Sequence, residues 1–302
     1  MKQFLLLLAL LAPIVHARTW TDLQGRKIEG EFVSQDAESV VLQLPGRGKP
    51  VPVLLANLSE ADCEFLRAQA ARANAPVAAS GRYEPQWTGK FAQGNFEEKL
   101  PFLLRVPMDL KPGGKYPLLL FLHGSGEKGN DNQKQLKHDP TKLAPDGVFE
   151  KNSMIVVAPQ CPADQSWSGQ TLETTIRLVK DLQKELPIDP QRIYITGLSM
   201  GGFGTWSALA LEPKLFAAAI PICGGGDPNS VEKFAKVPIW AFHGDADQTV
   251  KVESTRSMIE ALKKNGSEPK YTEYPGVNHD SWTRTYKDPA LYAWLLAQKK
   301  SD

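Results

Sequence analysis

Residues 193–211 hold the pattern that most constrains the fold of this chain. A β-branched and aromatic run over residues 193–196 meets Gly197-Leu198-Ser199-Met200-Gly201, and a stretch rich in small residues and leucine follows. This order predicts a strand, a sharp turn and a helix, with a G-x-S-x-G pentapeptide at the turn. Glycine at the flanking positions lets strand and helix pack closely. The pattern predicts that Ser199 is held in a strained conformation as a nucleophile; the competing interpretation is a glycine-rich turn with a capping serine.

Composition narrows the class of protein. The chain has 302 residues, 42% of them hydrophobic, which suits one large domain or a large domain and a small one. The formal net charge is +1, so there is no electrostatic reason to expect a nucleic acid or an anionic membrane as partner. No apolar stretch is long enough to predict a transmembrane segment.

The first 17 residues have the pattern of a secretory signal peptide. A short positive start precedes an apolar run over residues 4–15, and Val15-His16-Ala17 ends the run with small residues at alternate positions. We expect cleavage after Ala17 and a secreted or periplasmic protein. No cysteine stands at the cleavage site, so a lipid-anchored form is not expected.

Three cysteines, Cys63, Cys161 and Cys223, remain for the folded chain. An oxidising compartment permits one disulfide and one free thiol. Cys161 and Cys223 each follow an apolar run that predicts a buried strand, so a disulfide would join these two at one edge of the sheet. Three buried free thiols are the alternative.

Residues 18–70 differ in character from the rest of the chain. Short segments alternate polar and apolar residues, with tight turns at Gly25-Arg26 and at residues 46–48, which predicts antiparallel strands in a small β-barrel. A helix is expected to follow, with Ser59 as its N-cap and Asp62 at the position of a capping-box acid.

The sequence of this segment resembles the SLA1 homology domain 1, an SH3-like module. The matching stretches are R-x-W-T-D (18–22), G-R (25–26), I-x-G-E-F-V (28–33), the strand at 40–42 and L-S-E-x-D (58–62). In eukaryotic adaptors that domain serves protein–protein contacts. The resemblance implies a protein or surface contact through residues 18–70, and a small attachment or spacer domain is the simpler interpretation.

Residues 71–81 are expected to form a linker, and residues 82–302 a larger domain. Its first part, Tyr83 to Val106, is typical of an antiparallel hairpin. Short continuous apolar runs then alternate with helical stretches, which predicts a doubly wound, mostly parallel sheet with both faces buried. The runs cover residues 117–122, 154–158, 193–196, 217–222, 238–242 and 271–274. Such α/β sheets carry their functional sites at the carboxyl ends of the strands.

Acyl transfer through a serine needs a base and an acid that orients it, and in α/β-hydrolases they follow the serine in the order acid, then histidine. His279, on a loop after the last apolar run, is the expected base. The acid lies in His243-Gly244-Asp245-Ala246-Asp247, where the spacing favours Asp247. Asp245 is expected to shape the turn by bonding its own backbone, and His243 to be structural.

The oxyanion hole is expected after the first parallel strand, where H-G-S-G occupies residues 123–126. Its backbone donors would be the Met200 N–H and one N–H from Ser125 or Gly126. His279 would then activate Ser199 for attack on an ester carbonyl, and water would hydrolyse the acyl-enzyme. No metal or organic cofactor is expected, because the Asp, Glu and His residues do not cluster with metal-ligand spacing.

Taken together, five segments of residues 82–302 resemble secreted esterases of the α/β-hydrolase superfamily that are often labelled predicted peptidases, relatives of polyhydroxybutyrate depolymerases, feruloyl esterases and dienelactone hydrolases. The segments are F-L-H-G-S-G-E-K-G-N-D-N (121–132), A-P-Q-C-P (158–162), G-L-S-M-G-G (197–202), H-G-D-A-D (243–247) and Y-P-G-V-N-H-D-S-W (274–282). Lys128 and Asn278 depart from the usual family residues, often Arg and Gly, at positions outside the chemistry.

The resemblance implies carboxylesterase activity on a small-molecule or polysaccharide ester, with carbohydrate-linked or phenolic esters as candidates. Trp167 and Trp282 are candidate walls of the substrate pocket, although Trp167 equally fits a plain core position. Glu127 is expected mainly to order the oxyanion loop, with a substrate contact as the alternative. A serine peptidase, a lipase, and a protein-binding module that depends on residues 18–70 are the competing functions, and the natural ester is left open.

Overall fold

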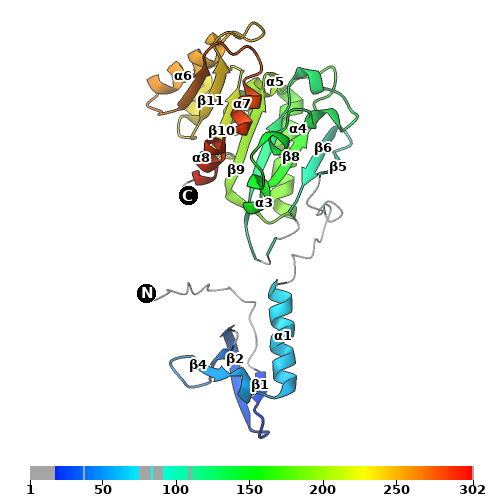
Figure 1. Ribbon diagram of the computed structural model, residues 1–302, viewed down its shortest axis with the longest axis vertical. Coiled ribbons are helices and arrows are strands. Elements are labelled where there is room, and N and C mark those ends of the chain that lie inside the picture. Colours follow the sequence, from blue (N-terminus) through cyan, green and yellow to red (C-terminus); the bar gives the residue numbers. More distant parts are fainter. Residues whose placement is uncertain are drawn as a thin grey trace. The chain divides into compact units, whose positions relative to one another are not determined.

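The computed structural model describes residues 18–36, 38–74, 83, 91–107, 110–111 and 113–300. The chain divides into two compact units between residues 75 and 76, and each unit is described by itself (Figure 1). The expected signal peptide, residues 1–17, and residues 75–81 of the expected linker lie outside the described residues.

The small unit is an antiparallel sheet of four strands followed by a helix. Its elements are β1 (Arg18–Thr21), β2 (Lys27–Gln35), β3 (Ser39–Gln43), β4 (Val51–Leu54), the short 3₁₀ helix η1 (Leu55–Asn57) and α1 (Glu60–Asn74). Alternate residues of β3, Val40 and Leu42, are buried with Trp20 and Leu66 in one core. The strands pair in the order β1-β2-β3-β4, which establishes a four-stranded sheet, a coarser result than the barrel predicted from the sequence.

Helix α1 begins at the residues that the sequence predicts. The Asp62 N–H donates to Ser59 Oγ at 3.2 Å, so Ser59 caps the helix as expected. The Asp62 carboxylate accepts from Ser59 Oγ at 2.9 Å and does not bond the Ser59 N–H. Instead it accepts from the Thr21 N–H at 2.7 Å and from Arg18 at 2.5 Å. Asp62 therefore ties the helix to strand β1 as well as capping it.

This network predicts that the Asp62 carboxylate contributes to the stability of the small unit. Asp62 is 3% exposed, so Asp62→Ala leaves the Thr21 N–H and the Arg18 guanidinium without their acceptor. We expect the small unit to lose about 1–3 kcal/mol of stability. Hydrogen exchange of peptides from residues 18–74 in the full chain measures the loss. Glu60→Gln, which removes an exposed ion pair with Arg67, is the matched control and should leave exchange unchanged.

The large unit is built on one sheet of eight strands. In chain order they are β5 (Phe91–Phe96), β6 (Leu100–Arg105), β7 (Tyr116–Leu122), β8 (Ile155–Pro159), β9 (Ile188–Leu198), β10 (Ala218–Ile222), β11 (Trp240–Gly244) and β12 (Lys270–Tyr274). They pair in the order β12-β11-β10-β9-β7-β8-β6-β5. β5 and β6 form the predicted antiparallel hairpin, β6 is antiparallel to β8, and the remaining pairs are parallel. The predicted mixed, mostly parallel α/β sheet is therefore confirmed.

Helices cover both faces of this sheet (Figure 1). Residues of α4 (Gly169–Glu185), α5 (Met200–Leu211) and α6 (Glu253–Lys264) share one hydrophobic core with Leu118, Leu120 and Leu122 of β7. Leu119 and Phe121 face the opposite core, together with residues of α3 (Val148–Lys151), α7 (Trp282–Lys287) and α8 (Pro289–Ala297). Since both faces are apolar, polar functional groups are left to the loops at the strand ends.

The shorter helical elements all lie in loops of this unit. They are η3 (Ser125–Glu127), η4 (Lys134–Leu136), α2 (Pro140–Leu143) and η5 (Pro228–Phe234). Within the part of the chain that the structure describes, no helix combines the length and the apolar character needed to cross a bilayer.

The candidate disulfide between Cys161 and Cys223 does not form in this structure. Both thiols are buried and free, and Cys63 is free and partly exposed. Cys161 follows β8 and Cys223 follows β10, and strands β7 and β9 lie between these two in the sheet. Three interstrand spacings amount to about 14 Å, twice the Cα separation that a disulfide can span. Position at one edge of a sheet therefore does not bring two cysteines into reach of one another.

Candidate active site

The turn at residues 197–201, here called the nucleophile elbow, joins β9 to α5. Ser199 has φ 52° and ψ −117°, a conformation that is strained for a residue with a side chain. A Cβ on Gly197 would lie 2.3 Å from the Gly201 carbonyl oxygen, and one on Gly201 would lie 1.9 Å from the Leu122 carbonyl oxygen. The two flanking glycines are therefore required by close backbone contacts, as the pentapeptide predicts.

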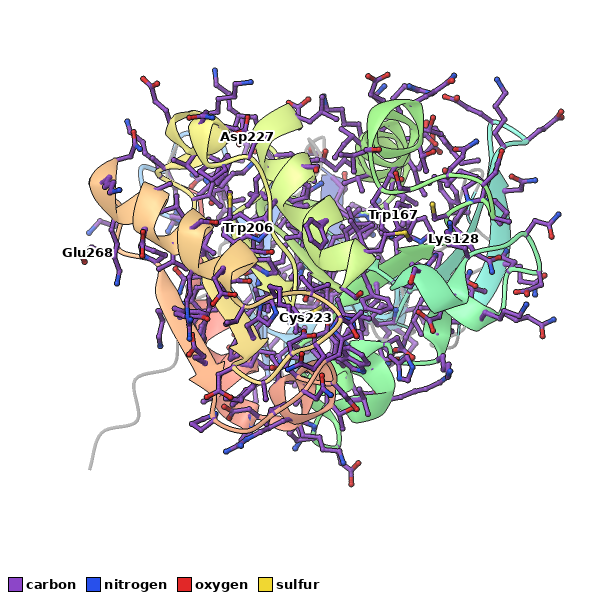
Figure 2. The ribbon with its side chains drawn as sticks, turned by 90° about the horizontal axis from the view of Figure 1, so that it is seen from above. Lys128, Trp167, Trp206, Cys223, Asp227 and Glu268 are labelled. Atoms are coloured by element: carbon purple, nitrogen blue, oxygen red, sulfur yellow. The ribbon has the colours of Figure 1, made fainter. Side chains whose placement is uncertain are left out.

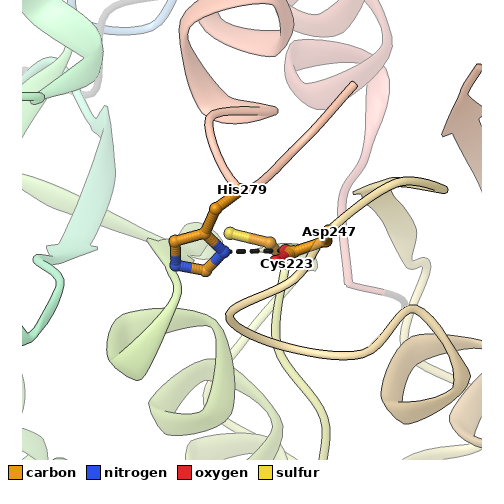
Figure 3. Close-up of side chains that lie close together, drawn as sticks. All are labelled: Cys223, Asp247 and His279. Atoms are coloured by element: carbon orange, nitrogen blue, oxygen red, sulfur yellow. Dashed lines mark hydrogen bonds and ion pairs between the residues drawn. The ribbon is translucent and has the colours of Figure 1, made fainter. Parts of the chain in front are cut away.

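Three loops bring the predicted triad residues together. Ser199 follows β9, Asp247 lies on the loop after β11, and His279 lies on the loop after β12. His279 Nε2 is 2.9 Å from Ser199 Oγ. His279 Nδ1 is 2.7 Å from Asp247 Oδ2, the contact drawn as a dashed line in Figure 3. With Nδ1–H donating to the carboxylate, Nε2 accepts the serine hydroxyl proton.

Asp247 is held as an anion by its surroundings. The residue is 3% exposed, and its Oδ1 accepts from the backbone N–H groups of Thr249 and Val250 at 2.8 and 2.9 Å. Burial alone would raise the pKa of this carboxyl. The hydrogen bonds from His279, Val250 and Thr249 outweigh burial, and the pKa of Asp247 is lowered. The carboxylate that meets His279 is therefore ionised and fixed in orientation.

Asp245, the competing acid, serves the neighbouring loop. Its Oδ1 accepts from the Gly276 N–H at 2.6 Å, which ties the loop after β11 to the loop after β12. The sequence predicts that Asp245 shapes its own turn; the structure shows instead a bond across to the His279 loop. Asn278 reinforces the same tie, since its Oδ1 accepts from the N–H groups of Gln248 and His279 at 3.0 and 2.8 Å.

His243 makes a contact with the acid that sequence reasoning misses. Its ring is fully buried, with Nε2 3.2 Å from Asp247 Oδ2 and 2.9 Å from the Val250 carbonyl oxygen. Nδ1 lies 2.7 Å from Thr255 Oγ1 on helix α6. Burial lowers the pKa of His243 despite the nearby carboxylate. A neutral His243 thus contacts the same Asp247 oxygen, Oδ2, as His279 does. Its four-residue spacing from Asp247 is the one sequence signal for this contact.

Cys223 is the second neighbour that the sequence does not predict for the site. The Ser199 N–H lies 3.3 Å from its Sγ, and Cys223 itself has a positive φ of 40°. The Sγ, one nitrogen of His279 and one oxygen of Asp247 all lie within 4.8 Å of one another (Figure 3).

These three donors have the spacing of a metal site, but hydrogen bonding accounts for them. His279 and Asp247 share one proton at 2.7 Å, and burial raises the pKa of Cys223 to about 12. The thiol acts as packing against the nucleophile elbow.

The oxyanion loop follows β7 and includes η3. Ser125 and Gly126 are exposed on it, and Met200 is the first residue of α5. The N–H groups in the first turn of a helix have no intrahelical acceptor, so the Met200 N–H is free to serve a ligand in the way predicted.

His123 anchors this loop from below. Its Nε2 accepts from the Cys161 N–H at 2.9 Å, and its Nδ1 donates to the Gly124 carbonyl oxygen at 2.6 Å. Burial lowers the pKa of His123 to about 4, so the ring is neutral at neutral pH. This neutral tautomer is the one that both bonds require.

Trp167 is not a wall of the substrate pocket, which corrects one of the two expectations from the sequence. It is 2% exposed, its Nε1 donates to the His123 carbonyl oxygen at 2.9 Å, and its ring lies edge-on to the His123 ring. Trp167 is labelled in Figure 2. The side chain belongs to the core beneath the oxyanion loop.

Trp282 and Glu127 both lie near the site. The Trp282 ring is perpendicular to the His279 ring, with centroids 5.4 Å apart, so Trp282 flanks the base. Glu127 is 5% exposed and packs against Gly124, where its Oε2 would be 3.1 Å from an added Cβ. That position fits the expected role in ordering the oxyanion loop.

Known proteins resemble the large unit. Residues 163–293 match the model of the Dienelactone hydrolase family. The bifunctional acetylxylan esterase/xylanase XynS20E of Neocallimastix patriciarum is 28% identical over 198 residues, which are 63% of this chain and 27% of that protein. Carboxylesterase SOBER1 of Arabidopsis thaliana is 26% identical over 209 residues, 60% of this chain and 90% of that protein.

Among solved structures, a thermostable esterase is 39% identical with a TM-score of 0.65, and the match covers 70% of this chain and 63% of that one. The chain thus spans about a quarter of the length of the acetylxylan esterase/xylanase and less than two thirds of the thermostable esterase. Fold, family match and relatives together support the class of serine ester hydrolases.

The His123 environment predicts a pH-dependent stability. The folded-state pKa of about 4 lies below the unfolded value near 6.5, so the unfolded chain binds this proton first as the pH falls. The contribution of His123 is complete above pH ~6.5 and declines by about 3 kcal/mol down to pH ~4. Urea unfolding of wild type and His123→Asn at several pH values measures it. Stability should fall less steeply with pH in the variant, and parallel curves would refute the assignment.

The nucleophile elbow predicts an unusual cost for one methyl group. Gly201→Ala should remove measurable ester hydrolysis and lower the melting temperature, because its Cβ would overlap the Leu122 carbonyl oxygen. Gly126→Ala is the matched control on the oxyanion loop, since nothing lies within 4 Å of its Cβ and the backbone N–H is kept. Circular dichroism melts and initial rates compare the two. Equal behaviour of the two variants would contradict the close contact.

Proposed function

We propose that this protein is a serine carboxylesterase with Ser199 as nucleophile, His279 as general base and Asp247 as the acid that orients it. The observation that carries the proposal is the continuous hydrogen-bond chain from Ser199 Oγ through His279 to Asp247, at 2.9 and 2.7 Å. The strained φ of Ser199 supports it, because the strain holds the hydroxyl at the carboxyl end of β9. The esterase relatives support an ester as the substrate class.

The geometry suits a two-step mechanism. His279 Nε2 takes the hydroxyl proton while Ser199 Oγ attacks the ester carbonyl, and Asp247 stabilises the imidazolium that forms. The Met200 N–H and one N–H of Ser125 or Gly126 hold the oxyanion, each contributing about 3 kcal/mol to the transition state. His279 then protonates the leaving alcohol, and a water activated by the same base hydrolyses the acyl-enzyme.

Location and substrate complete the proposal. The pattern of residues 1–17 supports export from the cytoplasm, with the mature chain starting at Arg18. A carbohydrate-linked or phenolic ester is the proposed substrate, and the acetylxylan esterase relative supports the carbohydrate-linked choice. All groups of the mechanism come from the large unit among the described residues, so residues 18–70 are proposed to serve attachment or contact with a surface.

Hydrolysis of p-nitrophenyl acetate tests the proposal. Wild type should release p-nitrophenol, and Ser199→Ala should lower kcat by about 10³-fold or more, because the acyl-enzyme cannot form. A wild type that hydrolyses no short acyl ester would overturn the carboxylesterase function. Intact-mass spectrometry after treatment with a fluorophosphonate should add one adduct to wild type and none to Ser199→Ala.

A second comparison tests which aspartate is the acid. Asp247→Asn should lower kcat by about 10³–10⁴-fold, because the amide cannot hold the required tautomer of His279. Asp245→Asn removes the charge but keeps a side-chain oxygen that can accept from the Gly276 N–H. This variant should therefore keep most of the activity. An inactive Asp245→Asn beside an active Asp247→Asn would reverse the assignment.

A further inference from the structure

A polar cavity of about 520 Å³ lies beside the oxyanion loop, outside the groups used in the mechanism. Three loops line it: the turn between β5 and β6, the segment after η3, and the loop between β8 and α4. The lining side chains that carry polar groups are Asn95, Glu98, Lys99, Asn130 and Asp164. A volume of this size matches the sites that hold small molecules.

The cavity lies at the same edge of the sheet as Ser199. β8 and β9 are both parallel to β7, so their carboxyl ends share one edge. β6 is antiparallel to β8, with Phe102 beside Pro159, so the start of β6 and the β5–β6 turn lie at that edge too. Two, three and four interstrand spacings separate β9 from β8, β6 and β5, which is about 10–19 Å. A ligand in the cavity could therefore be part of a molecule whose ester group reaches the nucleophile.

Buried amides hold the walls of the cavity in place. Gln160 is fully buried, and its Nε2 donates to the Glu127 carbonyl oxygen and to Asp131 Oδ1, both at 3.1 Å. Its Oε1 accepts from the Asn132 N–H at 2.6 Å. Gln160 therefore joins the β8–α4 loop to the oxyanion loop.

Asn132 extends the same network to the hairpin. Its Nδ2 donates to the carbonyl oxygens of Gly94 on β5 and Phe102 on β6, at 3.1 and 3.0 Å. Asn132 adopts a positive φ of 53° to do so. Residues 127–132, with the sequence E-K-G-N-D-N, therefore connect the oxyanion loop to the walls of the cavity.

The hairpin turn over the cavity is strained. Glu97 and Glu98 both have positive φ, 52° and 56°, where such turns normally carry asparagine and glycine. Glu97 is held by an ion pair with Arg177 of α4 at 2.8 Å. No ion pair like that of Glu97 is found for Glu98 among the described residues. The Glu98 side chain lines the cavity instead. A carboxylate at this unfavourable position is what a ligand contact would explain.

The lining indicates the chemistry of the ligand. Two amides, two carboxylates and one ammonium offer both donors and acceptors, and no aromatic side chain is among the lining residues that the structure describes. The formal charge of this lining is about −1, which disfavours a polyanion. Hydroxyl groups, which donate and accept, match such a mixed surface better than an acyl chain or a phenolic ring.

We propose that this cavity binds the hydroxyl-rich part of the substrate, a neutral sugar unit of a carbohydrate ester whose ester carbonyl is attacked by Ser199. The inference rests on the proposed esterase function and adds the site that binds the carbohydrate part of the substrate. The carboxylates of Glu98 and Asp164 accept from the sugar hydroxyls, and the Asn130 amide both accepts and donates. The amide network keeps their loops in register with the oxyanion loop.

Glu98→Gly provides the sharpest test, measured as KM for acetylated xylotriose and for p-nitrophenyl acetate. Glycine is favoured at a positive φ, so the variant should be at least as stable as wild type while lacking the carboxylate. We expect the ratio of the two KM values to shift about tenfold against the oligosaccharide, the size of one charge-assisted hydrogen bond. Asn130→Ala should shift the ratio in the same direction.

Glu268→Ala is the matched control. Glu268 is an exposed carboxylate in another surface pocket, of about 180 Å³, beside the start of strands β11 and β12. In Figure 2, Glu268 and Lys128 of the oxyanion loop lie at opposite sides of the view. The control should leave both KM values unchanged.

The outcomes separate the inference from the proposed function. A wild type that is inactive on p-nitrophenyl acetate overturns the function and the inference with it. An active wild type whose KM ratio is unchanged in Glu98→Gly and Asn130→Ala overturns the sugar site alone, as does an equal change for both substrates. A selective rise in KM for acetylated xylotriose, with the Glu98→Gly melting temperature maintained or raised, supports it.

Discussion

The contact between Gly201 and the end of strand β7 is the constraint on which the site depends. The Leu122 carbonyl oxygen occupies the space that a Cβ at Gly201 would need, so β7 and α5 meet backbone to backbone. This approach places the Met200 N–H next to the loop that begins at His123, and it leaves Ser199 in a strained conformation at the tip of the turn. The proposed nucleophile and oxyanion donors therefore come from one packing contact between adjacent elements.

The proposed base and acid are positioned differently, by hydrogen bonds between two loops. Asp245 and Asn278 connect the loop after β11 to the loop after β12, so the two loops that carry Asp247 and His279 are bonded to each other. Both carboxylate oxygens of Asp247 accept hydrogen bonds, and these bonds lower the pKa of Asp247 from its ordinary value. Burial of His243 and Cys223 beneath them keeps both neutral, so neither competes for the proton that His279 carries.

Buried polar groups connect the oxyanion loop to parts of the structure outside the proposed catalytic residues. His123 bonds the backbone of Cys161, and Gln160 and Asn132 continue the network to strands β5 and β6. Without partners, these buried polar groups would each cost free energy. With them, the groups connect the oxyanion loop, the β5–β6 hairpin and the β8–α4 loop through buried hydrogen bonds. A substrate site in that frame would be held in fixed relation to the reacting carbonyl.

The sequence by itself determined the large sheet, the flanking glycines of the nucleophile elbow and the three residues that the structure brings together at Ser199. These features depend on local sequence. They are the periodicity of hydrophobic residues, the positions that only glycine can occupy, and the order of the loops along the chain. Tertiary structure alone decided the separation of Cys161 from Cys223, the burial of Trp167, the bond from Asp245 to Gly276, and the partners of His243. Each depends on which strands are neighbours and how loops from distant segments meet, and a single sequence read locally holds no record of that strand order.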